Sequence, residues 1–357
     1  MKVKTYCLTA VFCCFASMGI CQNAVKDGLT LWTTAWDDFN IDTEYWVYKW
    51  TYSKADSAWS LEKEHFMTPE VQGEQWSANV FDMGMDMIVL KGRSDWSGIF
   101  SVSQGDSHFP STGTEFQHRR LNANGEWESV QPPLFSTVAD ISPLGVDIYY
   151  DGDELHIAWT EDNDEAGPKS LMCEIYDQAY TVNADGTLTA KGDKKLAWSR
   201  KLNWGASHPG LGGVAGLTVC DFDGDGDMDF IIGNMFYGDS PAKAAIQWIE
   251  RLGPTQWATN LKELWVGAPG HGAEGVCYAD IDGDQTLDLI ITSGGSYAWN
   301  IVVWFEKNGN VVEQVDSILD CNLEASFIEP GLSIGHIFGL FAPGPQATEI
   351  TDWSLFQ

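Results

Sequence analysis

The sequence predicts an all-β fold, a β-propeller of about five blades, and three observations support this prediction. The chain of 357 residues holds 36 glycines, 17 tryptophans and 17 phenylalanines, a composition typical of short strands joined by tight turns. Two acidic segments, 218–233 and 277–292, repeat one pattern at a spacing of about 60 residues. A Trp-x-Glu strand follows each segment, at Trp248 and Trp304.

In order along the chain, each repeat is predicted to contain a strand, an acidic loop, a second strand, the tryptophan-containing strand and a fourth strand. Four antiparallel strands in about 60 residues make one propeller blade. A single blade cannot bury both faces of its sheet, so neighbouring blades must stack around an axis. We expect Trp248 and Trp304, and Trp159 in a third Trp-x-Glu run, to pack blade against blade.

Weaker copies of the repeat extend the pattern along the chain. With the last aspartate of each acidic loop as the anchor, Asp86 and Asp147 align with Asp229 and Asp288, and a fainter match falls at Asp352. These five anchors predict five blades, with six or seven left open. Neither Asp86 nor Asp147 has enough neighbouring carboxylates in the sequence to predict a metal site.

Both ends of the chain carry strand patterns. Residues 29–32 and 45–50 are strand-like, and an inner-strand pattern lies close to the C-terminus. We therefore expect one blade to be shared between N-terminal and C-terminal strands, which closes the ring. A truncated longer propeller is the alternative.

The N-terminus has the pattern of an export signal. Lys2 and Lys4 precede an apolar run over 6–21, which is too short to span a bilayer. We predict a signal peptide over residues 1–22 and the propeller over 23–357, in a secreted protein that is extracellular or periplasmic. Lipoprotein anchoring at Cys21 is the alternative.

The charge of the chain limits its partners. Its 51 acidic and 20 basic residues give a net charge of −31, which repels nucleic acid and anionic lipid headgroups. We expect no nucleic-acid partner, no membrane span and a monomer. Of the eight cysteines, four lie beyond the signal region and form either two disulfides or buried thiols: Cys173, Cys220, Cys277 and Cys321.

The acidic segments predict two Ca²⁺ sites. In the first, Asp221, Asp223, Asp225 and Asp229 stand at loop positions one, three, five and nine, and the carbonyl of Asp227 at position seven can join them. Alternate carboxylates in a tight loop converge on one point, and hard oxygen donors suit Ca²⁺. The second loop has the corresponding residues Asp280, Asp282, Asp284, Thr286 and Asp288. We expect both ions to be structural.

The loops resemble the FG-GAP/VCBS repeat family, which includes integrin α-subunit propellers. The family pattern is Asp-x-Asp-x-Asp-Gly-x-x-Asp followed by an apolar strand, and the first loop fits it fully. The second loop departs at Gln285, where the family has the glycine found here as Gly226, so its affinity is expected to be weaker. The run Gly267 to Pro269 echoes a further family signature. The resemblance implies a calcium-binding propeller with an adhesion-like role.

Two further groups of residues suggest a ligand. His208, His271 and His336 precede predicted inner strands, so they either line the central opening as a metal or ligand site or shape structural turns. Tryptophans near turns suggest a glycan-binding surface. These are Trp32, Trp36, Trp46, Trp96, Trp204 and Trp299.

The sequence contains no nucleophile elbow, zinc-protease signature or phosphate loop, and we predict no catalytic residue. The favoured function is a non-enzymatic binding or adhesion module for an extracellular glycan or protein. A carbohydrate-active enzyme, either a polysaccharide lyase or a hydrolase with the histidine-lined opening as its site, is the alternative. A purely structural envelope or matrix component is a third hypothesis.

Overall fold

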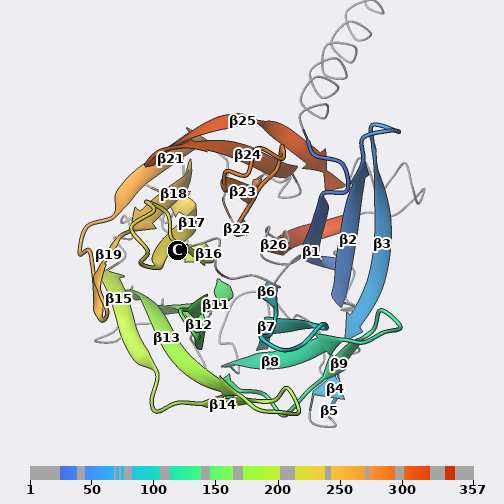
Figure 1. Cartoon of the computed structure of the whole chain (residues 1–357), viewed down its shortest axis with the longest axis vertical. Coiled ribbons are helices and arrows are strands. Elements are labelled where there is room, and N and C mark those ends of the chain that lie inside the picture. The colour runs from blue at the N-terminus through green and yellow to red at the C-terminus, as the bar shows by residue number, and fades with distance from the viewer. Residues whose placement is uncertain are drawn as a thin grey trace, which may run out of the picture.

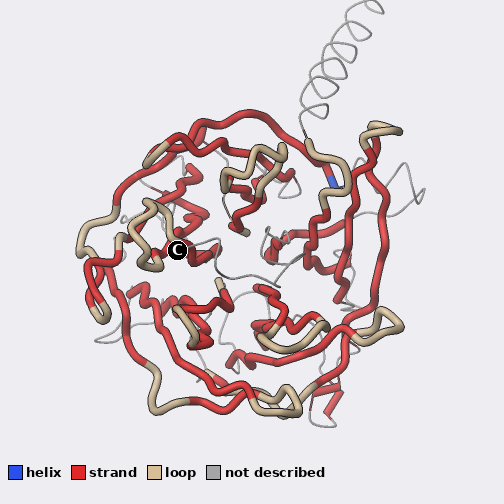
Figure 2. The backbone as a smooth tube through the Cα atoms, viewed as in Figure 1, coloured by secondary structure: helices blue, strands red, loops and turns tan. Residues whose placement is uncertain are grey.

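The computed structural model describes fourteen parts of the chain. They are residues 25–37, 45–67, 70–71, 74–75, 83–104, 113–137, 145–163, 172–201, 214–237, 243–269, 273, 275–293, 301–321 and 334–341. These residues are nearly all strand or loop, drawn in red and tan in Figure 2. The predicted signal peptide, residues 1–22, lies outside them.

Five sheets of four or five strands form a ring, which confirms the all-β propeller (Figure 1). Blade one contains β26 (Ile334–Phe341), β1 (Thr30–Asp37), β2 (Tyr45–Ser53) and β3 (Ala58–Met67). Blade two contains β6 (Met83–Val89), β7 (Trp96–Gln104), β8 (Gly113–Leu121), β9 (Trp127–Ser129) and β10 (Phe135–Ser136). Blade three contains β11 (Val146–Asp151), β12 (Glu154–Asn163), β13 (Met172–Val182), β14 (Leu188–Ala190) and β15 (Lys195–Lys201).

The last two blades carry the acidic loops. Blade four contains β16 (Val214–Cys220), β17 (Asp229–Tyr237), β18 (Lys243–Ile249) and β21 (Lys262–Pro269). Blade five contains β22 (Val276–Ala279), β23 (Asp288–Ser293), β24 (Ile301–Asn308) and β25 (Val311–Asp320). Two small hairpins lie outside the blades, β4 (Glu70–Val71) with β5 (Glu74–Gln75) and β19 (Arg251–Gly253) with β20 (Gln256–Trp257).

One strand of each blade lies at the centre of the ring (Figure 1). These inner strands are β26, β6, β11, β16 and β22, and each of them contacts the next one around the axis. The ring closes within blade one, where β26 pairs with β1 and Trp32 lies opposite Phe341. A blade shared between the two ends of the chain was predicted, and the pairing confirms it. The closing strand is 334–341, and the faint anchor at Asp352 lies outside the described residues.

Aromatic side chains fill the spaces between blades, as predicted for the Trp-x-Glu strands. Trp304 of blade five packs in one buried cluster with Trp50 of blade one, and Trp248 of blade four packs in another with Phe305 of blade five. Trp159 packs against Phe116 of blade two, with ring centroids 5.6 Å apart. Full burial of such a side chain stabilises the fold by roughly 1.5–3 kcal/mol.

The alignment of the weaker repeats was wrong by one strand. Asp229 and Asp288 begin the second strands of their blades, whereas Asp86 and Asp147 lie on the inner strands β6 and β11. Trp159 is likewise on a second strand, β12, whereas Trp248 is on the third strand of blade four. In blades two and three, short turns replace the acidic loops, so no landmark distinguishes the inner strand from the second.

The four cysteines beyond the predicted signal region are thiols, and all are at most 5% exposed. They lie in three separate core clusters, as expected of small apolar side chains: Cys277 and Cys321, Cys220, and Cys173. Among the described residues, no helix has the length and apolar character needed to span a membrane.

Candidate metal sites

The two acidic loops occupy equivalent places in neighbouring blades. Residues 221–228 join β16 to β17, and residues 280–287 join β22 to β23. Each loop therefore connects an inner strand to the second strand of its blade. The two strands that each loop joins are paired right up to the loop, with Cys220 opposite Asp229 and Ala279 opposite Asp288. A rigid hairpin base thus sets where each loop begins and ends.

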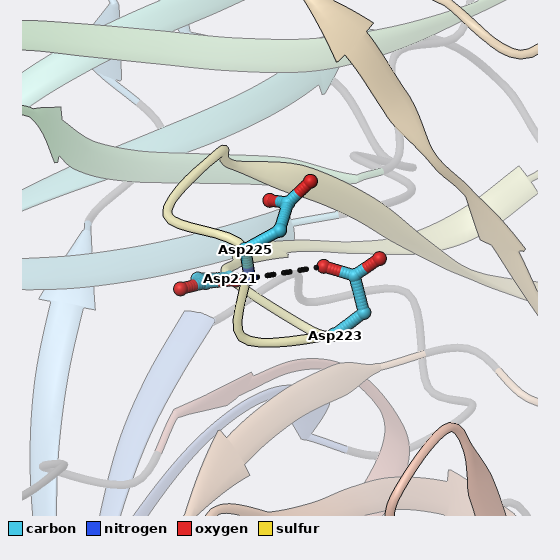
Figure 3. A group of neighbouring side chains, drawn as sticks. All are labelled: Asp221, Asp223 and Asp225. Carbon is cyan, nitrogen blue, oxygen red and sulfur yellow. Dashed lines mark hydrogen bonds between the residues drawn. The ribbon is translucent and has the colours of Figure 1, made fainter.

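The first loop brings together three of its predicted ligands. Oxygen atoms of Asp221, Asp223 and Asp225 lie within 4.8 Å of one another (Figure 3). The backbone holds them there, because Asp221 accepts hydrogen bonds from the amides of Gly224 and Gly226 at 2.8 and 3.1 Å. Asp223 Oδ1 accepts from the Asp225 amide at 3.2 Å, as the dashed line in Figure 3 shows.

The second loop repeats this arrangement. Oxygen atoms of Asp280, Asp282 and Asp284 again lie within 4.8 Å of one another. Asp280 Oδ1 accepts from the Gly283 amide at 2.8 Å, and Asp282 Oδ1 accepts from the Asp284 amide at 3.0 Å. At position five, Asp225 Oδ1 accepts from the Asp227 amide at 2.9 Å, and Asp284 Oδ1 accepts from the Thr286 amide at 2.6 Å. The carboxylates at positions three and five thus use Oδ1 for these backbone bonds, and their Oδ2 atoms can serve a cation.

The fourth predicted carboxylate lies at the base of each loop. Asp229 Oδ2 accepts from the Phe222 amide at 3.3 Å, and its Oδ1 accepts from the Arg251 amide at 2.7 Å. Asp288 Oδ2 accepts from the Ile281 amide at 3.3 Å. The structure does not group Asp229 or Asp288 with the three carboxylates above them. Ligation by these two residues, and by the carbonyls of Asp227 and Thr286, stays a prediction.

Burial and neighbouring negative charge disfavour the ionised form of the carboxyl group at the base of each loop. Burial raises the pKa of Asp229 to about 7, and the nearby charge of Asp223 contributes to the rise. Burial also raises the pKa of Asp288 to about 7, with a contribution from Asp282. A nearby divalent cation would favour the ionised form of both. The donor set of each loop, hard carboxylate oxygens on a short turn, fits Ca²⁺.

The second loop differs from the first by a lysine that sequence reasoning missed. Lys26 Nζ lies 3.5 Å from Asp280 Oδ2, and the Lys26 amide donates to the Ile281 carbonyl at 2.7 Å. Val25, beside it, is fully buried in the cluster between blades five and one. The segment before β1 therefore lies against the second loop and places an ammonium group beside its first carboxylate. No local sequence signal indicates this contact.

The structure describes only some of the histidines and tryptophans that were predicted to bind a ligand. His208 and His271 lie outside the described residues, and of His336 only the backbone, in β26, is described. Trp32 is buried, at 4% exposure, with its ring edge-on to Trp127, so it offers no face to a sugar. The side chains of Trp36, Trp46, Trp204 and Trp299 are outside the described set, and that of Trp96 is half-buried.

The ring of five sheets defines a five-bladed β-propeller, and its two acidic loops are candidate cation-binding sites. Residues 221–291, which contain both loops, match the model of the FG-GAP-like repeat, so the predicted resemblance is confirmed for this segment. A search of curated proteins finds no match to the chain.

Solved structures with similarity to the chain include three enzymes. The endo-arabinase from Bacteroides thetaiotaomicron is 15% identical, with a TM-score of 0.43 over 79% of this chain and 87% of that one. The exo-β-1,3-galactanase from Phanerochaete chrysosporium is 10% identical, with a TM-score of 0.45 over 79% of this chain and 62% of that one. The GH43_1 enzyme from Xanthomonas citri is 9% identical, with a TM-score of 0.39 over 68% of this chain and 75% of that one.

Proposed function

We propose that this chain is an extracellular, calcium-stabilised propeller that acts as a binding module for a glycan or protein partner. The observation that carries the calcium part is the gathering of three carboxylates in each of two equivalent loops. Asp221, Asp223 and Asp225 would hold one ion, and Asp280, Asp282 and Asp284 the other. The FG-GAP-like repeat that spans both loops supports this reading.

The role proposed for the ions is structural. When bound, Ca²⁺ supplies positive charge that offsets the repulsion among the carboxylates of each loop. The loop residues themselves do the positioning, since amides of the same turn hold the carboxylates. Because the loops join an inner strand to its neighbour, ordering them stabilises the hairpins β16–β17 and β22–β23. Binding to the folded state alone adds to its stability.

The calcium part is tested by titrating the purified, metal-free protein with Ca²⁺ in a calorimeter. We expect two ions per chain, and one ion in a variant that carries both Asp223→Asn and Asp225→Asn. Excess chelator should lower the melting temperature by several degrees. Asp153→Asn, which changes a fully exposed aspartate of blade three, is the control and should bind two ions. Uptake of no calcium by the wild type would contradict the proposal.

The binding part rests on the predicted export signal and on the rigid surface that a propeller offers. It is tested with a glycan array and a pull-down on immobilised polysaccharide, both in calcium-containing buffer. Retention without cleavage is the expected result. Release of shortened products would instead support the lyase or hydrolase hypothesis, and His271→Ala would then test the histidine-lined opening.

A further inference from the structure

One arginine connects the first acidic loop to the neighbouring blade. Arg251 begins β19, just after the third strand of blade four, and its side chain is 9% exposed. Its amide donates to Asp229 Oδ1 at 2.7 Å, and its Nη1 donates to Asp151 Oδ2 at 2.8 Å. Asp229 is the carboxylate at the base of the first loop, and Asp151 is the last residue of β11 in blade three. The backbone and the side chain of one residue thus link the loop to blade three.

The guanidinium group of Arg251 is held through all three of its nitrogen atoms. Besides the bond to Asp151, Nε donates to the Gly253 carbonyl and Nη2 to the Pro254 carbonyl, both at 3.2 Å. Its Cζ atom lies 5.5 Å from the centre of the Trp257 ring. A planar group held in this way has little freedom to rotate. The position of Asp151 and the position of the hairpin β19–β20 are therefore linked.

Aromatic packing extends this link to the strand that carries Asp229. Trp257 stacks on Phe230, with ring centroids 5.1 Å apart and an angle of 10° between the rings. Phe230 follows Asp229 in β17 and is fully buried. It belongs to the core cluster that blades three and four share, which also contains Tyr149 of β11. A shift of Arg251 relative to blade three would therefore disturb the base of the first loop.

The second loop is built differently at this point. The residue that corresponds to Arg251 is Lys307, because it stands three positions after Trp304 as Arg251 stands three positions after Trp248. Lys307 lies within β24 rather than in a separate hairpin. Its Nζ lies 5.1 Å from the centre of the Phe222 ring, in the first loop. The bridge to blade three is thus a feature of the first loop.

We propose that Arg251 is a positioning residue of the first cation site and couples that site to the interface between blades three and four. The coupling rests on the calcium binding proposed above for the first loop. Asp229 Oδ1 accepts from the Arg251 amide, and its Oδ2 accepts from the Phe222 amide at 3.3 Å, so the backbone orients this carboxylate. An ion in the loop attracts the carboxylate, and the bridge to Asp151 holds in place the residue that orients it.

Coupling of this kind acts in both directions. The bridge between Arg251 and Asp151 should raise the affinity of the first loop for Ca²⁺, and Ca²⁺ should in turn strengthen the bridge. Blades three and four would then be held together more tightly in the calcium-bound protein than in the metal-free protein. The ion would thus stabilise a contact between two blades as well as its own hairpin.

The test is Ca²⁺ binding to the first loop alone, measured by calorimetry on the full chain with Asp282→Asn and Asp284→Asn in the second loop. Arg251→Met keeps an apolar stem and removes the guanidinium group. Loss of a positive charge by itself would raise the affinity for a cation. We expect the affinity to fall instead, by roughly five- to tenfold. An affinity that rises or stays the same would overturn the proposal.

Two aspartates of the same hairpin give a matched pair of variants that leave Arg251 in place. Asp151→Asn weakens the bridge, whereas Asp153→Asn removes an equally short ion pair, with Lys91 of blade two at 2.8 Å. Only Asp151→Asn should lower the affinity of the first loop, and this effect should disappear in the Arg251→Met background. Equal effects of the two substitutions would overturn the proposal. If Arg251→Met does not fold, these two variants decide the question.

Hydrogen exchange gives a readout that does not depend on affinity. Ca²⁺ should slow the exchange of the amides at 149–151 in the wild type, and should slow it less in Asp151→Asn. Equal slowing in the two proteins would contradict the coupling. Uptake of one ion that responds to neither Arg251→Met nor Asp151→Asn overturns the coupling alone. Uptake of no ion, by this background and by the wild type, contradicts the proposed calcium binding as well.

Discussion

Gln285 in the second acidic loop adopts the same left-handed backbone conformation as Gly226 in the first, with φ angles of 72° and 93°. Only glycine adopts this conformation without a steric penalty. The departure from the family pattern therefore leaves the shape of the loop unchanged but strains it. The two loops should differ in stability more than in geometry.

Exchanging these two residues tests this strain. Gln285→Gly should stabilise the protein by roughly 0.5–1 kcal/mol, because relief of the steric penalty exceeds the added flexibility of the unfolded chain. The reciprocal change, Gly226→Gln, should destabilise it by a similar amount. Denaturant unfolding of both variants in calcium-containing buffer measures the effect. Changes of the same sign in the two variants would contradict it.

The ammonium group beside the second loop should weaken cation binding there. Lys26→Met keeps the apolar stem of the side chain and removes the charge 3.5 Å from Asp280. We expect Ca²⁺ affinity at the second loop to rise roughly two- to fivefold, as the loss of a partly exposed ion pair implies. Calorimetry in a background that lacks the first site measures this. The first loop, tested alone, should be unaffected by the substitution.

An indole hydrogen bond crosses the interface between blades one and five. Trp59 Nε1 on β3 donates to the Ile318 carbonyl on β25 at 3.1 Å, which links blade one to blade five. Trp59→Phe should lower the free energy of unfolding by about 2 kcal/mol, because it removes the hydrogen bond and leaves a cavity. Trp127→Phe is the matched control, since Trp127 is buried and its Nε1 has no partner among the described residues. Trp127→Phe should lower the free energy of unfolding by about 1 kcal/mol less than Trp59→Phe, because no hydrogen bond is lost. Equal losses would show that the Ile318 contact contributes nothing.

A half-buried histidine, His156, makes one part of the stability depend on pH. His156 is partly desolvated, which lowers its pKa, but the hydrogen bond to Asp177 at 3.0 Å and the charges of Asp177 and Glu154 raise it more. The folded-state pKa is therefore raised. The stabilisation is fully present below the unfolded-state pKa of about 6.5 and is lost as the pH rises through the folded-state value. His156→Gln should thus reduce the free energy of unfolding more at about pH 5.5 than at about pH 8.5. A loss that is the same at both pH values would exclude this effect.

The acidic loops were predictable because their spacing is unusual. Carboxylates at alternate positions around Gly226, followed by an apolar strand, fix both the hairpin and its place in the blade. The repeat of this pattern at Asp280 then predicted the period. The number of blades came from weaker anchors, and two of these, Asp86 and Asp147, lie on the inner strand instead of the second strand. The local sequence was enough for the two acidic hairpins.

The register of blades two and three was not predictable in the same way. An apolar strand with one aspartate, such as the strand that holds Asp86 or Asp147, has the same pattern whether it is the inner strand or the second. What distinguishes the positions is the partner across the blade interface, such as Val219 for Asp147, which is distant in sequence. The contact of Lys26 with Asp280 escaped prediction for the same reason.

Four of the blades are each built from one continuous stretch of chain, but blade one pairs strands that are about 300 residues apart. During synthesis, β1 therefore has an open edge until β26 has been made, and closing so long a loop is slow. Such an edge can accept a strand from another molecule. We therefore expect exchange of β26 between two chains to be the easiest misassembly of this ring, and slow expression to suppress it.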